Sequence, residues 1–137
     1  MTLFTFLARY SLELKGLLRI VAGLLFLSHG LVKLLGFPEG APPGLQPAFS
    51  LLWLAGVIEV VTGILITIGL FSRPAAFLAS GEMAIAYWGF HAGKGLFPIV
   101  NMGEGAILYC FLFLYFAASG PGALGVEKLP ERKRPFS

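Results

Sequence analysis

Residues 51–71 read LLWLAGVIEVVTGILITIGLF, an apolar stretch that contains one charged residue, Glu59. About 20 consecutive apolar residues are enough for a helix to cross the hydrocarbon core of a bilayer. An ionisable group at the middle of such a helix costs roughly 2.5 to 3.5 kcal/mol on insertion scales, and it usually faces the protein interior or a functional site. The stretch therefore predicts a membrane-spanning helix in which the carboxyl group of Glu59 is paired with another residue, is protonated or has a function.

The composition of the 137-residue chain agrees with a membrane protein. Hydrophobic residues make up 57% and charged residues only 12%, and the mean hydropathy is +0.84. A water-soluble domain of this size needs more polar surface than that. The single cysteine, Cys110, excludes an intramolecular disulfide and a Cys-x-x-Cys dithiol. The net charge of +3 gathers in a C-terminal tail, which we interpret as flanking a membrane, with no nucleic-acid partner.

Stretches rich in Gly and Pro divide the apolar segments. The sequence predicts four helices, at residues 17–36, 48–71, 74–91 and 103–118. Short connections make consecutive helices antiparallel neighbours. We therefore expect an all-α protein, an integral membrane bundle of four antiparallel helices. Its parts are an N-terminal cytoplasmic or interfacial segment (1–16), a four-helix transmembrane domain (17–122) and a basic cytoplasmic tail (123–137).

The basic residues set the expected orientation, because Lys and Arg concentrate in cytoplasmic loops. One side of the predicted bundle carries Arg9, Lys15, Arg19, Arg73 and the basic residues of the tail; the other carries only Lys33 and Lys94. This pattern predicts a multi-pass protein with both termini in the cytoplasm. Arg19 and Arg73 are expected at the inner headgroups.

Several polar residues fall in the outer half of the predicted bundle. At 1.5 Å per residue, His29 and Glu59 are nearly level, and Lys33 lies one turn further along the face of His29. Small residues at helical spacing place Glu59 and Glu82 toward the bundle interior. The candidate pocket and proton-handling residues are His29, Lys33, Glu59, Glu82, His91, Asn101 and Glu104.

The chemistry of these residues leaves alternatives open. Glu59 is either an interhelical strut or a group that handles protons, and a polar contact between membrane helices is worth only about 0.6 to 2 kcal/mol. We expect no metal site, since no Glu-x-x-His or His-x-x-x-His spacing occurs. A carboxyl beside a histidine suits quinone chemistry, in which ring carbonyls need hydrogen bonds and protons. Aromatic residues that can flank such a ring are Trp53, Tyr87, Trp88, Phe90 and Tyr109.

Two parts of the chain have a similar pattern of residues. His29 precedes a lysine and Phe37-Pro38, and His91 precedes a lysine and Phe97-Pro98. In each case the next predicted helix carries a carboxylate in its outer half. Two duplicated helical hairpins explain the pattern, and chance explains it as well, because the match is short.

Four segments together resemble the DoxX family of small bacterial membrane proteins: HGLVKLLGF (29–37), LAGVIEVVTGILITIGLFSRPAA (54–76), EMAIAYWGFHAGKGLFPIVNMGEGAILY (82–109) and SGPG (119–122). The resemblance implies a four-helix protein of the cytoplasmic membrane. The family takes its name from a subunit of a thiosulfate:quinone oxidoreductase. The family's recurring polar positions fall here on His29, Lys33, Glu59, Arg73, His91, Asn101 and Glu104.

Three functions follow as hypotheses. The first is a redox-associated, quinone-linked membrane subunit that works with a redox enzyme partner. The second is a non-catalytic membrane scaffold or partner subunit, and the third is a proton-coupled transporter of a small molecule. Quinone is the one cofactor suggested, the lipid bilayer is the expected surrounding, and a homo-oligomer is a further option. The sequence names no catalytic residue and leaves open whether the protein is an enzyme.

Overall fold

The computed structural model describes residues 2–127, and their regular structure is entirely helical. The α-helices are α1 (Leu3–Arg9), α2 (Ser11–Leu35), α3 (Leu51–Ile68), α4 (Ser72–Ala86), α5 (Pro98–Asn101) and α6 (Glu104–Ser119). A π-helical turn (Tyr87–His91) and a 3₁₀ turn (Ala92–Lys94) follow α4. The basic residues of the predicted tail, Lys128, Arg132, Lys133 and Arg134, lie outside the described residues.

The helical class is confirmed, and the helix bounds differ in detail. The first long helix, α2, begins at Ser11, so it takes in part of the segment 1–16 that was predicted to precede the bundle. Two helices, α2 and α3, are long and apolar enough to cross a membrane. α4 has 15 residues before its π-helical turn, and α6 is an apolar helix of 16 residues. A bundle of four membrane-crossing helices therefore stays a prediction.

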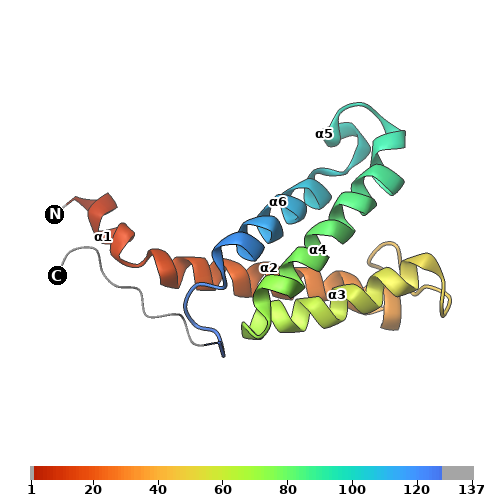
Figure 1. Ribbon diagram of the computed structural model, residues 1–137. Helices are drawn as coiled ribbons and strands as arrows, with labels where there is room; N and C mark the ends of the chain where they lie inside the picture. The colour runs from red at the N-terminus through yellow and green to blue at the C-terminus, as the bar shows by residue number, and fades with distance from the viewer. Residues whose placement is uncertain (1, 128–137) are drawn as a thin grey trace.

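The four long helices form two hairpins (Figure 1). α2 packs along α3 and α4 packs along α6, while α3 and α4 join the two pairs. The pairs meet near the short turn between α3 and α4 and diverge toward their far ends (Figure 1). The result is an open V in which each arm ends in its own loop, residues 36–50 on one arm and 92–103 on the other.

Glycines bring α2 and α3 into close contact. A Cβ atom on Gly30 would lie 2.7 Å from the carbonyl oxygen of Gly56, and a Cβ on Gly63 would lie 2.9 Å from the Cα of Leu27. Helix backbones approach this closely only where small residues face each other, which is a common interface in membranes. The glycines therefore set the rotation of α3 against α2, and with it the direction in which Glu59 points.

Arg19 holds the closed end of the V. Its side chain is fully buried, whereas the sequence predicted a position at the headgroups. The guanidinium donates hydrogen bonds of 2.7–3.0 Å to four backbone carbonyls, those of Ile66, Thr67, Pro121 and Ala123. The last carbonyls of a helix lack partners within the helix, and cations suit that end of its dipole. Arg19 therefore binds the end of α3 and the segment after α6 to α2.

A small aromatic cluster joins α2 to α6. Phe26 is fully buried, and its ring centroid lies 4.9 Å from that of Phe113 and 5.5 Å from that of Tyr109. Small residues of α4 complete this core, among them Ala75, Ala76 and Ala79. The groove described below lies between the same two helices, along the part of α2 that precedes Phe26.

Candidate functional site

The centre of the site is a buried ion pair between α2 and α3. Lys33 Nζ lies 2.5 Å from Glu59 Oε1 and 2.6 Å from Oε2. Glu59 is 1% exposed and Lys33 is 8% exposed. Gly56 makes room for the lysine stem, because a Cβ at this position would lie 2.9 Å from the Cβ of Lys33. The partner of Glu59 is therefore Lys33. It lies one helical turn beyond His29, the residue predicted at the same depth as Glu59.

Glu82 of α4 contributes a second buried carboxyl. Both of its oxygens are buried, and neither has a hydrogen-bond partner among residues 2–127. The charges of Glu59 and Lys33 act on this carboxyl. A buried polar group without a partner costs roughly 1–3 kcal/mol, so the position is unfavourable for stability alone. Such a group requires an explanation, and a role in function is one.

Tyr109 and His29 stand beside this charge cluster. The Tyr109 ring meets His29 edge to face, with centroids 6.0 Å apart, and stacks on Phe113. Glu59 acts electrostatically on Tyr109, and Lys33 acts on His29. His29 itself lies exposed at the surface of the protein. The ring contact thus links α6 to the part of α2 that lies beside the buried charges.

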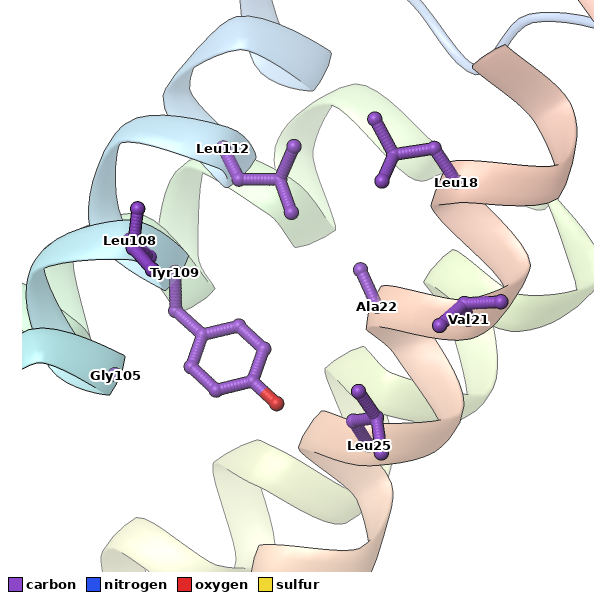
Figure 2. A pocket seen from close by; sticks show the side chains of 8 residues that line it. All are labelled: Leu18, Val21, Ala22, Leu25, Gly105, Leu108, Tyr109 and Leu112. Carbon is purple, nitrogen blue, oxygen red and sulfur yellow. The ribbon is translucent and has the colours of Figure 1, made fainter. Parts of the chain in front are cut away.

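An apolar groove of about 310 Å³ runs between α2 and α6 (Figure 2). Its lining consists of Leu18, Val21, Ala22, Leu25, Gly105, Leu108, Tyr109 and Leu112. The phenol of Tyr109 reaches across the groove from α6 toward α2, and its hydroxyl is the polar atom that Figure 2 shows on a lining side chain. The absence of a side chain at Gly105 keeps the α6 wall low. The groove is therefore apolar along its length and polar at Tyr109.

The remaining candidate residues lie elsewhere, at the tip of the second hairpin. Asn101 is buried, donates to the carbonyl of Gly95 (3.0 Å) and the hydroxyl of Tyr87 (3.3 Å), and accepts from the amide of Gly103 (2.8 Å). His91 Nδ1 lies 3.0 Å from the carbonyl oxygen of Asn101. These bonds tie the π-helical turn to the loop before α6.

The predicted cluster is thus divided into two groups. Lys33, Glu59 and Glu82 lie within electrostatic range of one another, with His29 beside them. His91 and Asn101 brace the outer loop, and Glu104 is an exposed residue at the start of α6. The arms of the V diverge toward this end (Figure 1), so residues at similar predicted depth are carried apart.

Sequence reasoning missed two features of this region. Tyr109 was named only as one of several aromatic residues, although it joins the groove to the charges; no sequence signal distinguished it from a membrane-interface aromatic. Arg19 was assigned to the headgroups because it falls in the first turn of the predicted helix 17–36, and no sequence signal indicated that its side chain would be buried. Among the described residues, no group of three or more His, Cys and acidic side chains is arranged to hold a metal ion.

The chain is similar to known proteins over most of its length. The family model for DoxX matches residues 14–92, more than half of the chain. An uncharacterized protein of Haemophilus influenzae is 47% identical over 125 residues, covering 88% of this chain and 93% of that relative. The inner membrane protein YphA of Escherichia coli is 31% identical over 125 residues, covering 80% and 85%. No solved structure matches the chain. The chain therefore belongs to the DoxX family.

Proposed function

We propose that this protein is a quinone-linked subunit of the inner membrane that holds a quinone ring in the α2–α6 groove. The observation that carries the proposal is the position of Tyr109, which lines the apolar groove and also lies within electrostatic range of Glu59. The groove volume of about 310 Å³ is at the lower end for small-molecule sites. It suits a single substituted ring better than a long tail.

The chemistry assigns separate roles to the groove and to a partner. Reduction of a quinone to a quinol takes two electrons and two protons. We assign the electrons to a redox enzyme partner, which is oxidised as the quinone is reduced. The Tyr109 hydroxyl donates a hydrogen bond to one ring carbonyl. We assign the two protons to the cluster of Lys33, Glu59 and Glu82, which passes them on one at a time and takes each replacement proton from water. The apolar walls exclude water, which strengthens these polar contacts.

The membrane setting follows from two arguments. α2 and α3 are long and apolar enough to cross a bilayer, and the chain is similar to an inner membrane protein over most of its length. We place the protein in the inner membrane as a multi-pass protein with both termini in the cytoplasm, because its basic residues gather on that side. A quinone dissolved in the bilayer then reaches the groove directly from the lipid.

Quinone retention tests the proposal. The full chain is purified from membranes in mild detergent, and bound quinone is extracted and quantified by chromatography. We expect retained quinone in the wild type, its loss in Glu59→Gln, and weaker retention in Tyr109→Phe, which removes only the hydroxyl. Repeating the assay after adding a soluble short-chain quinone guards against loss of the ligand during purification.

A matched pair of glycine variants tests the groove itself. Gly105 and Gly81 are both exposed helical glycines with no atom within 4 Å of an added Cβ, but only Gly105 lines the groove. Gly105→Leu should fill the groove and abolish quinone binding, whereas Gly81→Leu should leave it unchanged. Wild-type protein that binds no quinone, alone or with a co-purifying partner, would refute the proposal and favour the scaffold function.

A further inference from the structure

We propose that Lys33, Glu59 and Glu82 form a site for one exchangeable proton, which Glu82 carries, and that Lys33 turns from Glu59 toward Glu82 when this proton leaves. The inference goes beyond quinone binding, because it concerns the charge state of the cluster with the groove empty or full. It assigns a function to Glu82, the buried carboxyl without a hydrogen-bond partner among the described residues.

The buried cluster contains more carboxyl groups than cations. α2 contributes Lys33, with the imidazole of His29 at its edge. α3 contributes Glu59, α4 contributes Glu82, and α6 contributes the phenol of Tyr109. The cluster thus holds two carboxyl groups for one ammonium. With Glu82 as the neutral acid its net charge is zero, and with Glu82 ionised it is −1. An uncompensated charge in a buried, low-dielectric position is costly, so the neutral cluster holds one proton.

The two carboxyl groups of the cluster differ in their contacts. Both oxygens of Glu59 contact the Lys33 ammonium, at 2.5 and 2.6 Å, which is the arrangement of an ionised carboxylate with its counter-ion. Both oxygens of Glu82 are buried with no hydrogen-bond partner within the described part of the chain. A carboxylate in that position lacks the donors that stabilise its charge. The proton therefore resides on Glu82.

Movement of the Lys33 side chain allows the proton to leave Glu82. Loss of the proton gives Lys33 two carboxylates of equal charge to choose between, and the charges of Lys33 and Glu59 already act on Glu82. A lysine has a flexible stem and three donors on one nitrogen, so it can move between acceptors or bridge them. Placed between the two carboxylates, the ammonium shares its hydrogen bonds between Glu59 and Glu82, and the net charge of −1 is spread over both groups. The cluster then releases and rebinds a proton without leaving any carboxylate far from a cation.

Isotope-edited infrared spectroscopy tests the inference directly. All seven acidic residues of the chain are glutamates, so labelling with carboxyl-¹³C glutamate marks every acidic side chain. The full chain is placed in lipid nanodiscs at neutral pH, and the carbonyl stretch of protonated carboxylic acids is measured. We expect one such band in the wild type, its loss in Glu82→Gln, and its persistence in Glu104→Gln, the matched control at an exposed position.

A second variant tests the movement of Lys33. In Glu59→Gln, Lys33 has lost its counter-ion, so Glu82 should ionise to replace it and the band should disappear, although Glu82 is still present. Absence of the band from the wild type, its survival in Glu82→Gln, or its survival in Glu59→Gln would each overturn the inference. Because the spectrum requires no quinone, failure here is distinct from failure of the quinone-retention assay.

Discussion

The Lys33–Glu59 pair allows a quantitative prediction about stability. Replacing Lys33 by Met keeps the length of the side chain but leaves Glu59, which is 1% exposed, without its cation. Breaking one partner out of a buried ion pair typically costs about 3–5 kcal/mol. We expect Lys33→Met to lower the free energy of unfolding by an amount within this range. The reason is that Glu59 lies at the middle of α3 and cannot reach water by extending its side chain.

The reverse change should cost less. Glu59→Leu removes the counter-ion of Lys33, but Glu82 can ionise to replace it. Lys33 also belongs to the last turn of α2, where a lysine can extend toward the interface and the C-terminal carbonyls. We expect a loss of about 1–2 kcal/mol, below the usual range for a broken buried pair. The double variant, with apolar residues at both positions, removes both charges and should be close to wild type, since well-packed apolar replacements of buried ion pairs are often neutral or stabilising.

Reversible unfolding by a denaturing detergent in mixed micelles measures the free energy of unfolding of the wild type, the two single variants and the double variant. The coupling energy is the difference between the double variant and the sum of the two single variants. We predict a coupling energy of several kcal/mol, with the larger single loss at Lys33. Equal losses in the two single variants would refute the argument from position, and additive losses would show that the pair contributes no mutual stabilisation.

Three further predictions follow from the packing. Arg19→Lys should lower the free energy of unfolding by about 2–4 kcal/mol in the same assay. Lysine cannot replace the four hydrogen bonds of the guanidinium, each worth about 1.5–3 kcal/mol before compensation by water. Arg73→Lys loses a single exposed hydrogen bond to a carbonyl and should change the free energy of unfolding little. Gly63→Leu should force α2 and α3 apart and unfold the protein at lower denaturant concentration, whereas Gly81→Leu should behave as wild type. Asn101→Leu should raise hydrogen exchange of the outer loop amides by about tenfold or more without changing exchange in α2, and uniform exchange would contradict its local role.

Several properties of this protein follow from the sequence alone. The apolar run around Glu59 and the Gly- and Pro-rich breaks are local features, since helix formation and helix ends depend on residues a few positions apart. They located all four long helices, with errors of a few residues at most ends. The small residues on the face of Glu59 indicated that it points into the protein, and its burial agrees.

Other features were decided by tertiary structure. Lys33, rather than His29, pairs with Glu59, because the glycine contacts between α2 and α3 fix their rotation, and successive residues differ by about 100° around a helix. The separation of His91, Asn101 and Glu104 from the ion pair reflects the angle between the two hairpins, which depends on core packing around Phe26. Depth along a helix can be counted from the sequence, but the rotation and tilt that bring side chains together arise only when the helices pack.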